Sequence, residues 1–166
     1  MMKRLSDVGL RPFAGALALI SAGLLATVFV MQHFFGLEPC PLCVWQRYPH
    51  GVVILFGVLG AALGGMRARL LIAGAGLAFL VTAGIGAFQV GVEQHWWEGL
   101  ATCTGGAGVP GSLADLQSQL GKPAGPRCDE VAWSLFGISL AGYNMLVSFA
   151  VARLAFGRAM RAEKSR

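Results

Sequence analysis

Four long stretches without a charged residue dominate the pattern of apolar and polar positions along the chain. They are 26, 19, 23 and 22 residues long and cover residues 12–37, 48–66, 70–92 and 131–152. A helix needs about 20 apolar residues to cross the hydrocarbon core of a bilayer, which is roughly 30 Å thick. The pattern therefore predicts an all-α membrane protein whose four transmembrane helices form a bundle. The predicted spans are residues 14–35, 46–66, 70–92 and 132–153.

The composition agrees with this prediction. Apolar residues make up 55% of the 166 residues and charged residues only 13%, whereas soluble domains carry about 25% charged residues. A soluble enzyme and a protein that binds nucleic acid through a basic surface are therefore poor interpretations, and no nucleic-acid partner is expected. The length allows one domain, which we predict to be a single integral membrane domain over residues 1–166.

The basic residues Lys3, Arg4 and Arg11 precede the first span, as basic residues precede the apolar core of a secretory signal. Such a core is only about 7–15 residues long and ends at a cleavage site with small residues. The first apolar stretch is longer, and bulky residues at 31–35 end it. We therefore expect a retained span.

The distribution of charge predicts the orientation, because cytoplasmic loops carry an excess of lysine and arginine. The two termini and the turn between the second and third spans share one side of the membrane, and ten of the 13 basic residues fall there. Six of the eight acidic residues fall on the opposite side. Both termini are therefore predicted to be cytoplasmic and the other two loops extracytoplasmic.

The second extracytoplasmic loop covers about residues 93–130 and is long for a connection. Positions 112–115 have the spacing of a helix capping box, and leucines at 113, 116 and 120 recur on one helical face. We predict that this loop bears a short amphipathic helix.

Gly60 and Gly64 form a GxxxG pair in the second span. Such pairs let two helices approach closely, either inside the bundle or between two copies of the chain. We favour contacts inside the bundle.

All four cysteines fall in the two extracytoplasmic loops: Cys40, Cys43, Cys103 and Cys128. An oxidising compartment permits disulfide bonds there, and the even number pairs naturally as Cys40–Cys43 and Cys103–Cys128. The first pair is a C-x-x-C motif that leads into the second span. A thiol at a helix N-terminus forms the reactive thiolate more readily, and Arg47, four residues after Cys43, could add a stabilising charge. Pro49 implies either that the helix starts near Gln46 or that it kinks.

Other roles for these residues remain open. The Cys103–Cys128 pair could simply staple the loop, and four thiolates could bind zinc, although the gap between Cys103 and Cys128 is long for a zinc knuckle. Covalent haem attachment is excluded because Val44, not histidine, follows Cys43. Arg47 could be an interfacial anchor.

Further polar and aromatic residues lie near the outer ends of the spans. Trp45, Trp96 and Trp97 are expected in the aromatic belt, and His33 and His95 as interfacial caps.

Two dithiols at a membrane surface can pass oxidising equivalents between a soluble protein and a lipid-soluble acceptor. A pair on a long loop can meet a protein, and a pair at the hydrocarbon boundary can meet a quinone in a crevice of the bundle. Position and chemistry alone do not give the direction of electron flow.

In these features the chain resembles the DsbB family, the disulfide bond formation proteins B of bacterial inner membranes. The resemblance covers essentially the whole chain. It rests on the four spans, the loop pair Cys103/Cys128, and the residues Cys40-Pro41-Leu42-Cys43, Arg47, Gln89 and Glu93-Gln94-His95.

The resemblance implies a quinone-dependent thiol oxidase that reoxidises DsbA, a soluble thioredoxin-fold oxidant of the periplasm. By analogy, Cys103 takes the mixed disulfide with the partner, Cys128 then attacks Cys40, and Cys43 is released to donate electrons to ubiquinone or menaquinone. Arg47 would lie beside the quinone head group. The family also places a polar residue near the quinone at the outer end of the third span, and Glu93, Gln94 and His95 are all candidates for it.

Two alternatives belong to other classes of function. One is a quinone-linked reductase of the vitamin K epoxide reductase type, in which electrons flow in the opposite direction. The other is a non-enzymatic membrane protein with structural or zinc-binding cysteines. The chain order, with the C-x-x-C motif before the second span, favours the interpretation as a DsbB-like protein.

Overall fold

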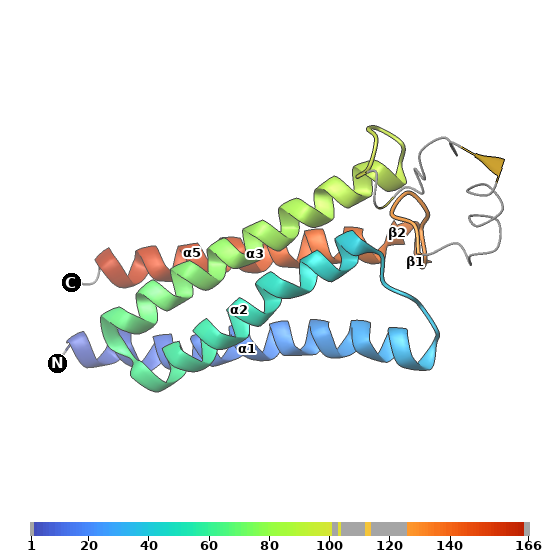
Figure 1. The fold of residues 1–166 in the computed structure, drawn as a ribbon. Helices are drawn as coiled ribbons and strands as arrows, with labels where there is room; N and C mark the ends of the chain where they lie inside the picture. Colours follow the sequence, from blue (N-terminus) through green and yellow to red (C-terminus); the bar gives the residue numbers. More distant parts are fainter. Residues whose placement is uncertain (1, 101–102, 104–111, 114–125, 165–166) are drawn as a thin grey trace.

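The computed structural model describes residues 2–100, 103, 112–113 and 126–164. Within these residues four long helices pack into a bundle: α1 (Met2–Phe34), α2 (Pro41–Leu63), α3 (Gly65–Glu93) and α5 (Leu140–Lys164). An antiparallel hairpin precedes α5 and consists of β1 (Ser134–Leu135) and β2 (Ile138–Ser139). Both termini lie at one end of the bundle, which we call the terminal end (Figure 1). The hairpin and residues 35–40 lie at the other, the loop end (Figure 1).

The predicted fold class is confirmed. In the described part of the chain, four helices are long and apolar enough to cross a membrane, and they comprise Gly9–Phe34, Pro41–Leu63, Gly65–Glu93 and Leu140–Arg161. Large apolar side chains such as Leu19, Leu70 and Leu154 are more than half exposed on the outside of the bundle. An outer surface of this kind is suited to lipid rather than to water. The short helix predicted in the second loop falls largely outside the described residues.

All four helices begin elsewhere than the apolar pattern predicted, and α1 and α3 begin earlier, at Met2 and Gly65 rather than at residues 14 and 70. Helix α2 begins at Pro41 rather than at residue 46 and continues through Pro49, since proline suits the first helical position. Helix α5 begins at Leu140 rather than at residue 132, because the hairpin occupies the preceding residues. Ser139 caps it by accepting a hydrogen bond from the Gly142 N–H at 3.1 Å.

Close contacts hold α1 against α2. A Cβ atom added to Gly57 would lie 2.7 Å from the Ala14 carbonyl oxygen, and one added to Gly60 would lie 2.9 Å from the Ala14 Cβ. At the tight α2–α3 turn, Gly64 has φ +69°, which favours glycine. Arg11 of α1 donates to the Ala61 and Ala62 carbonyls at 2.8 and 2.7 Å and so caps the end of α2. Gly57 and Gly60 thus serve packing inside the bundle.

The buried apolar residues form two clusters. The terminal core draws on all four helices and contains Leu10, Ala14, Leu17, Val53, Ala68, Ile72, Ala75, Ala78, Phe79, Val151, Ala152, Ala155 and Ala159. The second cluster lies at the loop end and contains Cys40, Leu42, Val92, Cys103 and Cys128. Three of the four cysteines are therefore core residues.

Candidate redox site

The Cys40-Pro41-Leu42-Cys43 segment forms the start of α2. Cys40 has extended backbone geometry, and its Sγ accepts a hydrogen bond from the Cys43 backbone N–H at 3.3 Å. The sulfur thus takes the place of an N-cap side chain. The Sγ atoms of Cys40 and Cys43 lie 2.7 Å apart. Both sulfurs therefore meet at the positive end of the α2 dipole, where negative charge is favoured.

The two thiols of this pair lie in different environments. Cys40 is 3% exposed, whereas Cys43 is only partly buried. The hydrogen bond to Cys43 and burial both raise the pKa of the Cys40 thiol well above its usual range. Cys40 therefore keeps its proton at neutral pH, and a negative charge on the reduced pair belongs on Cys43.

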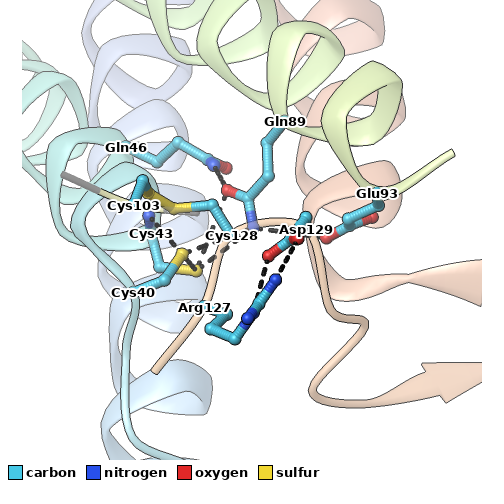
Figure 2. The surroundings of a disulfide bond; sticks show 9 residues. All are labelled: Cys40, Cys43, Gln46, Gln89, Glu93, Cys103, Arg127, Cys128 and Asp129. Atoms are coloured by element: carbon cyan, nitrogen blue, oxygen red, sulfur yellow. Dashed lines mark hydrogen bonds and ion pairs between the residues drawn. A yellow bond between two sulfur atoms is a disulfide. The ribbon is translucent and has the colours of Figure 1, made fainter. Parts of the chain in front are cut away.

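Cys103 and Cys128 form a disulfide bond directly beside this pair (Figure 2). Both residues are buried, and the Cys128 N–H donates to the Cys103 carbonyl at 2.8 Å. The sulfur atoms of Cys40, Cys103 and Cys128 lie within 4.8 Å of one another. The structure thus brings the four predicted cysteines together from two different loops.

Three sulfur atoms at this spacing could also hold a metal ion. Zinc binds cysteine as the thiolate, and the sulfurs of a disulfide are not thiolates. A metal site at this cluster therefore requires the Cys103–Cys128 bond to be reduced.

Gln89, near the end of α3, contacts both sulfurs of the C-x-x-C motif. Its Nε2 lies 3.3 Å from the Cys43 Sγ and 3.6 Å from the Cys40 Sγ. Its Oε1 accepts a hydrogen bond of 2.6 Å from Gln46 Nε2. Both amides are buried. A donor in this position stabilises a thiolate more than a thiol.

A cavity of about 510 Å³ lies beside Cys40 and Cys43, a volume typical of sites for small molecules. Helices α1 and α5 contribute mostly apolar residues to its walls, while α2 contributes a polar face. That face consists of Cys43, Gln46, Arg47 and His50, which are spaced at i, i+3, i+4 and i+7 and so share one side of the helix. The cavity could take a flat molecule with polar groups at its edge.

Arg47 lines this cavity and points toward α1. Its Nη1 donates to Gln32 Oε1 at 2.9 Å, and its guanidinium carbon lies 4.9 Å from the centre of the Phe29 ring, a distance at which cation–π attraction operates. The sequence suggested that Arg47 stabilises Cys43, but the structure places Gln89 at that sulfur. Arg47 remains available to a molecule in the cavity.

The polar residues at the end of α3 differ in their placement. Glu93 is buried and lines the cavity, whereas Gln94 and His95 are exposed. Glu93 Oε1 accepts a hydrogen bond from Gln89 Nε2 at 3.2 Å, and Oε2 has no hydrogen-bond partner among the described residues. Of the three candidates that the sequence left open, Glu93 is the one that faces the cavity.

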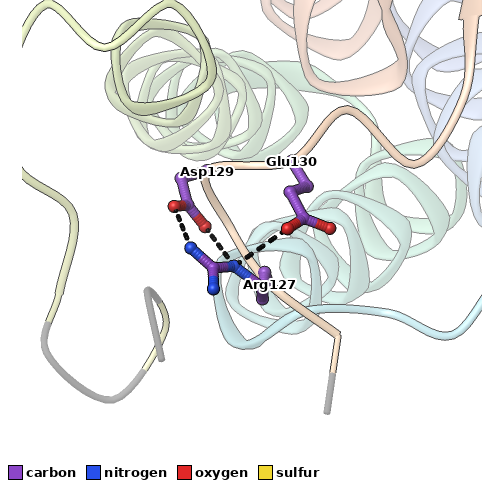
Figure 3. A network of polar contacts seen from close by, with 3 residues as sticks. All are labelled: Arg127, Asp129 and Glu130. Carbon is purple, nitrogen blue, oxygen red and sulfur yellow. Dashed lines mark hydrogen bonds and ion pairs between the residues drawn. The ribbon is translucent and has the colours of Figure 1, made fainter. Parts of the chain in front are cut away.

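A small group of charges adjoins Cys128 (Figure 3). Arg127 donates to both carboxylate oxygens of Asp129, at 3.0 and 2.6 Å, and its Nε lies 3.1 Å from Glu130 Oε1. Hydrogen bonds from Arg127 lower the pKa of Asp129, and the same bonds raise the pKa of Arg127. The loop disulfide is therefore bordered by charged, solvent-facing groups.

The tryptophans that were expected in an aromatic belt all lie toward the loop end of the bundle. Trp45, Trp96 and Trp97 are 50%, 68% and 45% exposed. His33 stacks on Phe29 with ring centres 6.4 Å apart. None of these four residues lines the cavity.

Sequence reasoning gave no role to Gln46, Gln89, His50 or Asn144. The signal was present, because polar side chains inside apolar spans are costly and usually functional. Their partners lie on other helices, and which helix faces meet is not readable from one sequence.

The comparisons with known proteins agree with this geometry. The family model for disulfide bond formation protein DsbB matches residues 10–157. Relatives named disulfide bond formation protein B include one from Azoarcus sp. strain BH72, 32% identical over 163 residues that cover 91% of this chain and 95% of the relative. Another, from Marinobacter nauticus, is 36% identical over 143 residues that cover 78% and 80%. No solved structure matches the chain significantly. Over nearly its whole length, the chain thus belongs to the DsbB family of disulfide bond formation proteins.

Proposed function

We propose that this multi-pass membrane protein is a thiol oxidase that reoxidises a periplasmic thioredoxin-fold protein of the DsbA type and passes the electrons to membrane quinone. The observation that carries the proposal is the sulfur cluster, in which Cys40, Cys103 and Cys128 lie within 4.8 Å of one another while Cys43 lines the cavity. Exchange requires one sulfur to attack another directly. This arrangement lets the loop pair exchange with the C-x-x-C pair over a short distance.

The first two steps are thiol–disulfide exchanges. A thiolate of the reduced partner attacks Cys103, which breaks the Cys103–Cys128 bond, forms a mixed disulfide and releases Cys128 as a thiolate. Cys128 then attacks Cys40 in the oxidised Cys40–Cys43 pair. A Cys40–Cys128 bond forms, and Cys43 leaves as a thiolate.

Two further exchanges complete the transfer. The second thiol of the partner attacks the mixed disulfide, so the partner departs oxidised and Cys103 is freed. Cys103 attacks Cys128, which restores the Cys103–Cys128 bond and frees Cys40. Two electrons and two protons now reside on Cys40 and Cys43.

Reoxidation of Cys40 and Cys43 releases two electrons and two protons. Their acceptor would be a bound membrane quinone, either ubiquinone or menaquinone. The cavity fits such a head group in volume and in its apolar walls from α1 and α5. Arg47 would bind a carbonyl oxygen, and Glu93 would exchange a proton there through Oε2, which has no hydrogen-bond partner among the described residues. Cys43 would face the ring from the start of α2.

We place the protein in the bacterial inner membrane with the loop end in the periplasm. Two observations support this orientation: both termini lie at one end of the bundle (Figure 1), and ten of the 13 basic residues belong to that side. The cysteine cluster then faces the oxidising compartment.

Anaerobic quinone consumption tests the proposal. Detergent-purified protein is mixed with a reduced thioredoxin-fold dithiol protein and a short-chain ubiquinone, and the quinone absorbance is followed. We expect one quinone lost for each disulfide formed in the partner. No loss with ubiquinone or a menaquinone analogue, from folded protein, would refute the oxidase.

The reverse assay addresses one alternative, and a metal analysis addresses the other. A quinone-linked reductase with the opposite direction of electron flow would reduce the partner's disulfide and oxidise quinol in a mixture that starts from oxidised partner and quinol. A zinc site, which the three-sulfur cluster also suits, would be revealed by stoichiometric zinc in protein purified under reducing conditions.

A further inference from the structure

A row of polar side chains, buried except for the partly buried Asn144, crosses the bundle between the terminal core and the sulfurs. Hydrogen bonds link His50 and Gln46 of α2 with Gln89 of α3 and Asn144 of α5. Such groups are costly inside a membrane protein and usually serve a function. Of these four, only Gln89 contacts a sulfur atom, so the proposed exchange steps leave the other three without a role.

Three amides of this row point in one direction. Asn144 Nδ2 donates to Gln46 Oε1 at 2.6 Å, and Gln46 Nε2 donates to Gln89 Oε1 at 2.6 Å. Gln89 Nε2 in turn lies 3.3 Å from the Cys43 Sγ. Figure 2 shows the last two links, which converge on the C-x-x-C motif. Each amide therefore presents its N–H toward the sulfur end of the row.

Thr82 of α3 determines this direction. The backbone carbonyl of Gln46 can only accept, so the Thr82 hydroxyl, 3.1 Å away, must donate to it. The Thr82 oxygen is then an acceptor, and the Asn144 amide 3.0 Å away must present its NH₂ group. The Asn144 oxygen turns to the other side, where Ser148 donates to it at 3.1 Å and His50 Nε2 lies at 2.9 Å.

The orientation of the other two amides follows from that of Asn144. Because the second N–H of Asn144 needs an acceptor, Gln46 turns Oε1 toward it and Nε2 toward Gln89. Gln89 must then turn Oε1 toward Gln46 and its NH₂ group toward the sulfurs. One backbone carbonyl thus sets, through three amides, which end of Gln89 faces Cys43.

We propose that this row holds Gln89 with its N–H groups toward Cys43 and thereby stabilises the Cys43 thiolate that is released during exchange. Thr82, Asn144 and Gln46 act as positioning residues. The two ends of a glutamine amide have nearly the same shape. Turned the other way, Gln89 would place its carbonyl oxygen against the thiolate and repel it. The inference rests on the proposed redox role of the C-x-x-C pair, but not on the identity of the partner or the acceptor.

Other titratable groups near Cys43 also influence the stability of its thiolate. Cys40 lies at 2.7 Å, Glu93 shares the Gln89 NH₂ group, and Arg47 lies one turn further along α2. The same cavity is also lined by Glu38, His50, Arg127 and Glu130. None of them changes in the variants below, so a shift reports on the amides.

The pH dependence of Cys43 alkylation tests the inference. Full-length protein is reduced anaerobically and treated with iodoacetamide at a series of pH values, and the label on Cys43 is quantified by mass spectrometry. The thiolate is the reacting form, so the midpoint of the profile reports its stability. Gln89→Met removes the donor and keeps the chain length. This variant should raise the midpoint by about one to two pH units. Below the midpoint, the thiolate fraction at a given pH would then be roughly 10- to 100-fold smaller.

Two hydroxyl variants provide a matched comparison. Thr82 and Ser148 are both fully buried and both hydrogen-bond to Asn144, and neither contacts a sulfur. Only Thr82 sets the direction of the amide. Thr82→Val should therefore raise the midpoint by about half a pH unit, a roughly threefold smaller thiolate fraction, whereas Ser148→Ala should leave it unchanged.

An unchanged midpoint in Gln89→Met would overturn the inference, as would equal shifts in the two hydroxyl variants. Exchange of the Cys103–Cys128 bond with a reduced thioredoxin-fold protein checks that each variant is folded, and the hydroxyl pair decides alone if Gln89→Met does not fold. The readout uses no quinone. If the midpoints shift but the unaltered protein consumes no quinone, the role of the amide row is supported and the transfer of electrons to quinone is refuted. If the unaltered protein consumes quinone but the midpoints do not shift, the oxidase is supported and the role of the amide row is refuted.

Discussion

The two halves of the bundle differ in what they bury, although the same helices run through both. Apart from Phe79, the terminal half buries small and aliphatic side chains, and α1 approaches α2 closely at Gly57 and Gly60. The loop half buries sulfur atoms together with Gln46, Gln89 and Glu93, and it leaves a cavity of about 510 Å³. One half is filled by close packing, and the other keeps polar groups and open space.

This difference shows how a small membrane protein can combine stability with chemistry. Lipid is as apolar as the helices, so helix association depends on close van der Waals contact and on polar links rather than on the hydrophobic effect. The terminal half relies mainly on close contact, with the Arg11 hydrogen bonds at the end of α2, and the loop half relies on hydrogen bonds between buried side chains. We therefore expect substitutions in the two halves to separate stability from activity.

The largest effect should come from Cys43→Ser in the loop half. Serine cannot form the Cys40–Cys43 disulfide, so quinone consumption should fall to background while the melting temperature changes little. The loop disulfide should still be reducible by the thioredoxin-fold partner. Retained turnover in this variant would contradict the assignment of Cys43 as the donor to quinone.

A substitution in the terminal half should have the opposite consequence. Gly57→Ala would place a methyl group 2.7 Å from both the Ala14 carbonyl oxygen and the Ala18 Cβ, and overpacking of this kind costs about 1–3 kcal/mol. Its melting temperature in detergent should fall, while the KM for quinone of the folded protein stays unchanged. Gly51→Ala in the same helix is the control, because a Cβ there meets nothing within 4 Å. It should be neutral or stabilise by up to about 1 kcal/mol.

Arg47→Ala should have an intermediate effect, confined to the cavity. Loss of a charge-assisted hydrogen bond to the bound head group should raise the KM for quinone by about tenfold. The KM for the protein partner should stay within about twofold, because Arg47 faces α1 and the cavity rather than the loop disulfide. Equal changes in both constants would instead favour a role as an interfacial anchor.

The four helices were predictable because the cost of a charge in hydrocarbon acts on every residue of a span. Helix ends were less predictable, because local chemistry sets them. Residues 132–139 carry no charge, and yet residues 134–139 form the hairpin, in which Phe136 and Gly137 have φ values of 51° and 77°. The count of charge-free positions does not register such a turn.

The candidate site divides in the same way. Topology placed the cysteines in the two outer loops, and the structure shows them together there. The contact between Gln89 and Cys43 could not be predicted, because α3 is apolar on most sides and its pattern does not say which face meets α2. Direct spacing favoured Arg47 as the group beside Cys43, and only the packed helices show Gln89 in that place.

The smallest effect should come from the exposed charges beside Cys128, which contrast with the buried amides. Hydrogen bonds from Arg127 lower the pKa of Asp129. The pair therefore contributes to the stability of the fold at and above the ordinary pKa of an aspartate, and this contribution is lost as the pH falls through the lowered pKa. Arg127→Ala should therefore raise the pKa of Asp129 toward its usual range, as measured by NMR of carbon-13-labelled aspartate. At neutral pH Asp129 is ionised in both proteins, and water screens exposed charges. The rate of exchange between the partner and the loop disulfide should accordingly change by less than about twofold, while a larger change would show that these charges orient the partner.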